Sequence, residues 1–194
     1  MTFKRVLMLA VLLVQSFAGD LIAEIDHTKY GILGKPAPAL KTSTWHQLPD
    51  GKQSLDIADF KGKVTYLYFF QSWCPGCHKI GFPTLKKVSD AFQNDDSVTF
   101  AAIQTTFEGH SINTSEKLKQ IAQKYDLKIP FGQSAGTSGT PDIMKKYRTG
   151  GTPWVVIIDD QGRVVFNDFH VDADAAIAAI RKMSASLKQA PSGP

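Results

Sequence analysis

The sequence predicts an α/β protein with a central mixed sheet flanked by helices. Residues 64–70 and 98–103 are near-continuous apolar runs rich in aromatic and β-branched residues, which is typical of strands buried on both faces. Along the chain, a strand–helix–strand unit is followed by another helix, a hairpin and a last helix. This order is typical of a helix-flanked sheet. We find no internal repeat and no linker long enough to split the domain.

The first half of the predicted domain opens with a hairpin. Residues 40–48 and 52–57 alternate polar and apolar side chains on either side of Pro49-Asp-Gly51. The strand at 64–70 then leads into a helix, and the strand at 98–103 follows that helix. The helix is indicated by four apolar residues at helical spacing: Phe82, Leu85, Val88 and Phe92.

A second helix is expected after these strands, because apolar residues recur at i, i+3, i+4 and i+7. These residues are Leu118, Ile121, Ala122 and Tyr125. Asn113 and Glu116 are placed like a capping pair for this helix. Residues 132–140, rich in Gly, Ser and Thr, are expected to form a loop, and residues 143–147 a short helix.

The predicted domain closes with a hairpin and an amphipathic helix. The hairpin strands are residues 154–158 and 164–169, joined by a turn at 159–162. The apolar positions of the last helix are Ile177, Ile180, Met183 and Leu187. We expect the domain to span residues 39–188 and residues 189–194 to form a frayed tail.

Residues 1–18 have the layout of a secretory signal peptide, and residues 19–38 are expected to form an N-terminal extension. Lys4 and Arg5 precede nine apolar residues, and Ser16-Phe-Ala18 supplies the small residues of a cleavage site. Nine residues span about 14 Å as a helix, which is under half of the roughly 30 Å hydrocarbon core. We therefore expect an exported, periplasmic protein that is soluble after cleavage, with an uncleaved anchor as the alternative.

The charge pattern excludes a nucleic-acid surface. The chain carries a formal net charge of +4, which falls to +2 once Lys4 and Arg5 are removed with the signal peptide. The remaining charges are scattered rather than grouped in basic runs. Only two cysteines are present, so the chain is no disulfide-stapled miniprotein.

The segment most informative about chemistry follows the strand at 64–70 and reads Ser72-Trp-Cys-Pro-Gly-Cys-His78. A cysteine at a helix start faces unpaired backbone N–H groups and the positive end of the helix, which stabilise its thiolate. Cys77 lies one turn after Cys74, close enough to form a disulfide with it. The pair can therefore exchange disulfides: Cys74 attacks a target disulfide and Cys77 resolves the mixed disulfide, or the reverse sequence runs from the oxidised pair.

Two other interpretations of this cysteine pair are a zinc site and a structural disulfide. A zinc site needs two further ligands, but the chain has no other cysteine and no His-x₃₋₅-His pair. A structural disulfide across two residues is strained and stabilises little through so small a loop. We therefore expect neither a metal nor a cofactor.

The chain resembles the thioredoxin superfamily in two motifs: Trp73-Cys-x-x-Cys77 after a buried strand, and Gly151-Thr-Pro153 before a later strand. The signal peptide, the leading hairpin and the stretches 60–63 and 157–163 are similar to its exported TlpA/ResA-like branch, which is related to the redoxins. The resemblance covers roughly residues 34–188 and implies a thioredoxin-like fold.

This resemblance implies a role for five residues. Cys74 matches the family's exposed nucleophile and Cys77 its buried resolving thiol. Pro153 matches a cis-proline that faces the disulfide, which leaves the backbone at Thr152 free to pair with an extended substrate strand. Trp73, next to the motif, is expected to shield the thiols and contact partners.

The chain departs from the family at the two positions where an acid assists proton transfer to the resolving thiol. Thioredoxin carries a buried Asp six residues before its first cysteine, where this chain has Tyr68. ResA-like members often place a Glu three residues after the second cysteine, where this chain has Ile80. Glu108 and His78 are the remaining candidates for handling that proton, each with a solvated surface position as its alternative.

Two further differences concern the chain after the motif. The family's helix proline lies one place later here, at Pro83, because of Gly81, which predicts a bulge or a loosened first turn. The exported branch inserts a helix and a strand between the two motifs, and residues 117–131 fit that insertion.

We expect a thiol–disulfide oxidoreductase that acts as a reductase of exported protein disulfides. A reductase in an oxidising compartment needs electrons from outside, so we expect a membrane thiol-relay partner as well as protein thiol or disulfide substrates, and a monomer. The same dithiol is also compatible with an oxidant that donates disulfides, because Pro75-Gly76 does not settle the direction.

Two alternatives belong to other classes of protein. A thiol peroxidase needs Pro-x-x-x-Thr-x-x-Cys, but Leu67 and Gln71 occupy the Pro and Thr positions. A copper-binding assembly factor would use Cys74 and Cys77, with His110 or His170 as a third ligand, because soft thiolates suit Cu(I).

Overall fold

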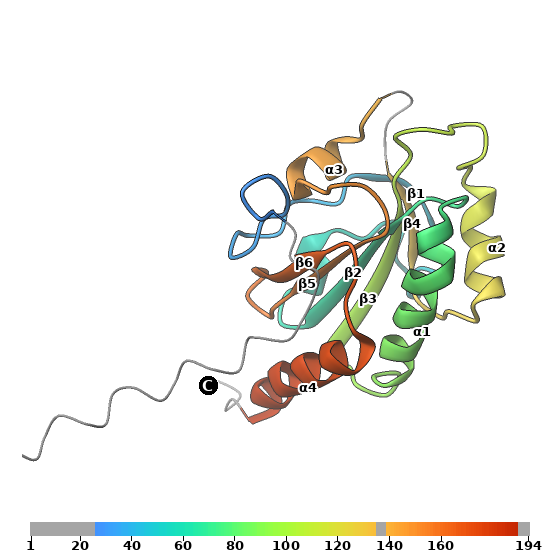
Figure 1. Ribbon diagram of the computed structural model, residues 1–194. Coiled ribbons are helices and arrows are strands. Elements are labelled where there is room, and N and C mark those ends of the chain that lie inside the picture. Colours follow the sequence, from blue (N-terminus) through green and yellow to red (C-terminus); the bar gives the residue numbers. More distant parts are fainter. Residues whose placement is uncertain (1–25, 135–138, 190–194) are drawn as a thin grey trace, which may run out of the picture.

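The computed structural model describes residues 26–134 and 139–189, and a six-stranded mixed sheet forms its centre (Figure 1). The strand order is β1-β4-β3-β2-β5-β6. The strands are β1 (Thr42–His46), β2 (Val64–Phe70), β3 (Val98–Gln104), β4 (Phe131–Ser134), β5 (Trp154–Ile158) and β6 (Val164–Asp168). The predicted helix-flanked α/β architecture is thus confirmed.

Strand β2 is the centre of the fold. All seven of its residues are buried, as its apolar sequence predicts. It pairs in parallel with β3 and antiparallel with β5, and β5 forms the predicted hairpin with β6. Because side chains on both faces of β2 are buried, other elements must cover each face of the sheet.

The helices cover the two faces unequally (Figure 1). Helices α1 (Phe82–Asp90), α2 (Glu116–Lys124) and α4 (Ala173–Gln189) pack on the face to which β2 contributes Tyr66, Tyr68 and Phe70. Helix α3 (Asp142–Tyr147) and the 3₁₀ turn η1 (Ile57–Phe60) pack on the other face, against Leu67 and Phe69. Because side chains alternate along a strand, β2 supplies both cores.

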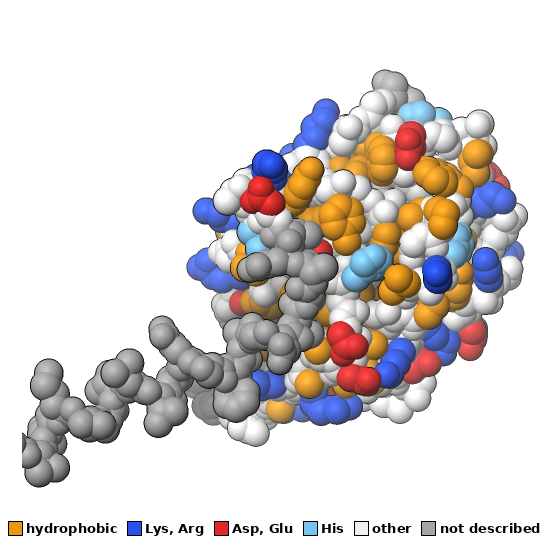
Figure 2. Space-filling view, in the orientation of Figure 1, with side chains coloured by type: hydrophobic (Ala, Val, Ile, Leu, Met, Phe, Trp, Pro, Cys, Tyr) orange, Lys and Arg blue, Asp and Glu red, His pale blue; other side chains and the backbone are white. Residues whose placement is uncertain are grey.

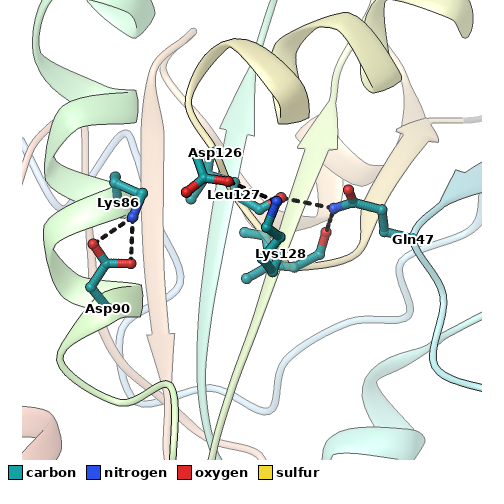
Figure 3. Close-up of polar contacts among 7 residues, drawn as sticks. Gln47, Lys86, Asp90, Asp126, Leu127 and Lys128 are labelled. Atoms are coloured by element: carbon teal, nitrogen blue, oxygen red, sulfur yellow. Dashed lines mark hydrogen bonds and ion pairs between the residues drawn. The ribbon is translucent and has the colours of Figure 1, made fainter.

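The predicted N-terminal hairpin is wrong. Residues 52–57 contain no strand, and β1 instead pairs antiparallel with β4. Its end is fixed there by Gln47, whose Nε2 donates to the carbonyl oxygens of Leu127 and Ile129 at 2.9 and 2.8 Å (Figure 3). The alternating pattern identified a strand at 40–48 but carried no information about its partner, because hairpin and long-range pairings need the same alternation.

Residues 52–57 lead into η1 rather than into a strand. Asp56 and Asp59 form a capping box there: the Asp56 carboxylate accepts from the backbone N–H of Ile57, and the Asp59 carboxylate accepts from that of Asp56. Leu55 of this stretch is buried, as is Phe60 at the end of η1, while Ile57 is half-buried. The alternation therefore reflects local packing of a turn.

The loop predicted at 132–140 is also wrong at its start, because β4 includes Gly132 to Ser134. A Cβ at Gly132 would lie 3.0 Å from both Ile103 Cδ1 and Thr42 Cγ2. The glycine therefore allows neighbouring strands to approach closely, which is one of the uses of glycine within a strand. The helix of the insertion predicted at 117–131 is confirmed as α2, but its strand, β4, begins only at Phe131.

The described part of the predicted N-terminal extension, residues 26–38, is hydrogen-bonded to side chains that lie far along the chain. Arg148 donates to the carbonyl oxygens of Thr28 and Lys29, and the Asn167 side chain accepts from the backbone N–H of Ile32 at 2.6 Å. The signal peptide predicted at 1–18 lies outside the described residues. Among those residues, no helix has the length and apolar character to cross a membrane.

Candidate functional site

The two cysteines lie where β2 gives way to helix, as predicted. Cys74 follows a tight turn in which its N–H donates to the carbonyl of Gln71 at 3.2 Å, and a π-helical turn, η2 (Cys77–Gly81), then leads into α1. This turn is the loosened start of the helix that Gly81 and Pro83 predict. Helix α1 is packed on the sheet, so it fixes both cysteines at the carboxyl end of β2.

Both cysteines are free thiols, and they differ in surroundings. Cys74 is 6% exposed and Cys77 is fully buried. Cys74 is therefore the more accessible of the two, but the exposed thiol that the family resemblance implies is largely covered here. The reason is that the backbone at Thr152 lies against it, with the Cys74 Sγ 3.5 Å from the Thr152 carbonyl oxygen.

Hydrogen bonds shift the pKa values of the two thiols in opposite directions. The Cys77 thiol donates to the Cys74 sulfur, and the Cys77 backbone N–H donates to it at 3.3 Å. Together with Gly76 N–H and Thr152, these bonds lower the pKa of Cys74 to about 6 against the opposing effect of burial. The pKa of Cys77 is raised well above its ordinary value because its thiol donates to the Cys74 sulfur and because it is buried. At neutral pH the pair therefore holds one thiolate, on Cys74, and one thiol, on Cys77.

The Gly151-Thr-Pro153 motif lies opposite the cysteines. The Thr152–Pro153 peptide bond is cis. A Cβ at Gly76 would lie 3.3 Å from Pro153 Cδ, so the glycine between the cysteines lets the proline approach closely. Within the described residues, the Thr152 backbone makes no hydrogen bond to another backbone group. Its carbonyl oxygen lies beside the Cys74 sulfur.

Trp73 lies at the rim of the site with 43% of its surface exposed. Its indole packs on Gly109, where a Cβ would lie 3.2 Å from the indole nitrogen. Ile112 and Ile80 are similarly exposed, at 50% and 45%. Figure 2 shows hydrophobic side chains gathered around the N-terminal end of α1 on this face.

Asn113 has a role in the site that the sequence did not predict. This residue does not cap α2, whose N-cap is Ser115 without a side-chain bond. It is 3% exposed, and its Oδ1 accepts from the backbone N–H and the hydroxyl of Ser72 at 2.7 and 2.9 Å. Its Nδ2 donates to Gln71 Oε1 and to the carbonyls of Glu108 and Gly109. Asn113 thus ties the loop after β3 to the residues that precede Cys74.

The two residues considered for the proton of Cys77, His78 and Glu108, both lie away from its sulfur in their contacts or exposure. The His78 ring lies 2.6 Å from the Ser72 carbonyl through Nε2 and 2.7 Å from the Tyr125 hydroxyl through Nδ1. A carbonyl only accepts, so Nε2 carries a proton and donates a hydrogen bond to Ser72. Glu108 is exposed on the loop after β3. Within the described residues, neither side chain is bonded to a thiol.

The described residues contain no group of three or more His, Cys, Asp or Glu side chains arranged to hold a metal ion. The two histidines considered as copper ligands, His110 and His170, therefore do not form such a group with the cysteines.

The fold and the dithiol at the start of α1 define a thioredoxin-like protein. A sequence model of the redoxin family matches residues 32–181, so the chain belongs to the redoxin family. It is 28% identical to the thiol-disulfide oxidoreductase ResA of Bacillus cereus (strain ZK / E33L) over 133 residues, which are 69% of this chain and 67% of that one.

Solved structures agree with this assignment. The thioredoxin-like superfamily protein SPOA0173 is 32% identical with a TM-score of 0.69, over 77% of this chain and 96% of that one. A thiol-disulfide isomerase from Corynebacterium glutamicum is 28% identical with a TM-score of 0.64, over 77% and 97%. This protein is a thiol–disulfide oxidoreductase of the thioredoxin superfamily, in its ResA/TlpA-like branch.

Proposed function

We propose that this oxidoreductase reduces protein disulfides, with Cys74 as the attacking thiolate and Cys77 as the resolving thiol. The Cys74 thiolate attacks one sulfur of the target disulfide, which releases a target thiolate and forms a mixed disulfide. Cys77 then loses its proton and attacks the Cys74 sulfur, which releases the second target thiolate. The target gains two electrons, and the Cys74–Cys77 pair becomes a disulfide.

The observation that carries this proposal is the lowered pKa of Cys74. A value of about 6 leaves Cys74 ionised at neutral pH, while Cys77 stays protonated until the mixed disulfide forms. Stronger stabilisation of the thiolate makes a pair more oxidising, because it favours the reduced form. The corresponding cysteine has a pKa of about 7 in thioredoxin and about 3.5 in the oxidant DsbA, so the value here supports a reductase.

The substrate is expected to lie across Cys74 as an extended segment. The Thr152 backbone, beside the cis Pro153, has no backbone hydrogen-bond partner among the described residues, which supports pairing with such a strand. The exposed indole of Trp73 offers an apolar contact beside it. These three residues form the proposed substrate-binding site.

We further propose that the protein works after export and receives its electrons from a membrane dithiol. The layout of residues 1–18 supports export. Because disulfides persist in an oxidising compartment, the oxidised Cys74–Cys77 pair needs a dedicated donor there.

The experiment that tests the roles of the two cysteines is capture of a mixed disulfide. Cys77→Ser keeps the attacking thiolate and removes the resolving thiol, so it should form a stable mixed disulfide with proteins of an exported fraction. Cys74→Ser, the matched control, should capture none. Capture by Cys74→Ser alone, or by neither variant while the wild type still exchanges, contradicts the assignment.

A further inference from the structure

A buried tyrosine of β2 contacts the turn that carries the resolving cysteine. Strand β2 places Tyr68 beneath η2, fully buried, where the family's acid is absent. Its ring stacks on Phe70 at 6.0 Å and meets Phe82 edge-on at 5.1 Å between centroids. These two aromatic contacts fix the direction of the ring, so its hydroxyl points to one place.

That place is the backbone of Cys77. The Tyr68 hydroxyl donates to the Cys77 carbonyl oxygen at 3.3 Å. The same oxygen accepts the N–H of Phe82, the bond that closes the π-helical turn. Burial raises the pKa of Tyr68 well above its ordinary value, so the hydroxyl keeps its proton at every working pH. It is a permanent donor at the turn that carries Cys77.

Gly81 makes room for this hydroxyl. A Cβ at position 81 would overlap the Tyr68 hydroxyl oxygen and would lie 2.6 Å from its Cζ. Contacts under 3.0 Å require a shift of the neighbouring group, and the Tyr68 ring is held between two aromatic rings. Tyr68, Gly81 and η2 therefore form one unit, in which the glycine and the wider turn admit the tyrosine.

We propose that Tyr68 is a positioning residue for the resolving step: its hydroxyl holds the turn that carries Cys77, so that the Cys77 sulfur stays in reach of the Cys74 sulfur. This inference rests on the proposed role of Cys77. In the step itself, Cys77 gives its proton to solvent, a bond forms between the two cysteine sulfurs, and the bond from Cys74 to the target breaks. Tyr68 donates a hydrogen bond throughout and neither gains nor loses a proton.

The groups around Cys77 support this assignment. On its own turn the Cys74 sulfur raises the pKa of Cys77; the backbone of Gln71 and the hydroxyl of Tyr68 on β2 lower it. None of these is a carboxylate or a cation. His78, on the same turn, is bonded to Ser72 and to Tyr125 of the segment after α2 instead. Tyr68 is therefore the side chain that is hydrogen-bonded to Cys77 from the buried side.

The test is Tyr68→Phe, with Tyr66→Phe as the matched control. Tyr66 lies two residues earlier on the same face of β2, is also fully buried, and its hydroxyl has no hydrogen-bond partner among the described residues. The reduced protein is mixed with dithiobis(nitrobenzoate), a small aromatic disulfide, without an excess of the reagent. Each of the two steps of the reaction then releases one coloured thiolate. The first release reports attack by Cys74, and the second reports resolution by Cys77.

We expect Tyr68→Phe to leave the first release unchanged and to slow the second about fivefold at neutral pH, since the turn that carries Cys77 loses one hydrogen bond between neutral groups. Tyr66→Phe should change neither release. An unchanged second release in Tyr68→Phe, or equal slowing in Tyr66→Phe, overturns the proposal. A wild type with no second release would instead contradict the role of Cys77, so the two failures are distinguishable.

Gly81→Ala supplies an independent variant. It should slow the second release because its Cβ displaces the hydroxyl, and Tyr68→Phe added to it should slow that release no further. Effects that simply multiply in the double variant would show that Gly81 and Tyr68 act separately, against the proposal.

Discussion

Cys74 and Cys77 are three residues apart, yet their surroundings are opposite. Cys74 faces outward to hydrogen-bond donors and to the backbone of Thr152, which come from its own turn and from a loop far along the chain. Cys77 is fully buried and faces Tyr68 of β2. The neighbours, and not the cysteines themselves, therefore decide which sulfur is ionised.

The largest expected effect comes from removing the outer thiol. Cys74→Ser should reduce disulfide exchange to the rate of buffer alone, because Cys77 is buried and protonated. Turnover of a protein disulfide with a dithiol as the electron source measures this. Substantial residual exchange in the variant would mean that Cys77 attacks targets directly.

The difference between the thiols also predicts the pH dependence. Alkylation of Cys74 should follow a titration with a midpoint at about pH 6. Because the bond from the Cys77 thiol is the main cause of the lowered pKa, Cys77→Ala should move the midpoint towards the ordinary value of about 8.5. Rates of alkylation by iodoacetamide, measured at about one point per pH unit from roughly pH 4 to roughly pH 10, check the midpoints of the wild type and of the variant. An unmoved midpoint would assign the effect to the backbone N–H groups alone.

The same lowered pKa links pH to stability. A group with a lowered pKa in the folded state stabilises it fully above the unfolded value and loses that contribution as pH falls through the folded value. The reduced protein should therefore become more stable as the pH rises from about 6 towards about 8.5. Denaturant unfolding of the reduced wild type and of Cys74→Ser should show a slope that the variant lacks. Equal slopes would contradict the lowered pKa.

A smaller effect, on stability, is expected at Asn113, which bonds the residues before Cys74 from the loop after β3. Asn113→Ala removes the side chain that bonds Ser72 and Gln71, and should lower the free energy of unfolding by about 1–3 kcal/mol. Asn94→Ala, at an exposed position, is the control and should change little. Chemical denaturation measures both. Equal stabilities of the two variants would show that the Asn113 bonds do not hold the loop.

The smallest effect is expected at the rim. Trp73→Ala should raise the KM for a protein disulfide a few-fold with little change in kcat, because the half-exposed indole contacts substrate and not the sulfurs. Leu33→Ala, at a residue 51% exposed in the N-terminal segment, is the control and should leave KM unchanged. A fall in kcat with unchanged KM would instead make Trp73 part of the support of Cys74.

The sequence was most informative where local pattern and burial coincide. The apolar run at 64–70 became a fully buried β2, and the helical spacing after it became α1. The cysteine motif could be placed at the end of that strand because both of its neighbours were predictable. Even the irregular turn at Gly81 was expected from the shifted proline at Pro83.

Long-range relations could not be predicted in the same way. Alternation at 40–48 identified a strand, but its partner β4 lies some ninety residues away in a stretch that looks like a loop. Asn113 has the sequence signature of a helix cap, and only the packed structure reveals that it faces Ser72 instead. Tyr68 was expected to be buried, but its bond to Cys77 depends on the space left by Gly81.

The central claim, that the pair works as a reductase, is tested most directly by its reduction potential. Equilibration of the Cys74–Cys77 pair against glutathione or dithiothreitol buffers should give a value near or below that of thioredoxin, about −270 mV. A value near that of the oxidant DsbA, about −120 mV, would reverse the direction of electron flow and contradict the account.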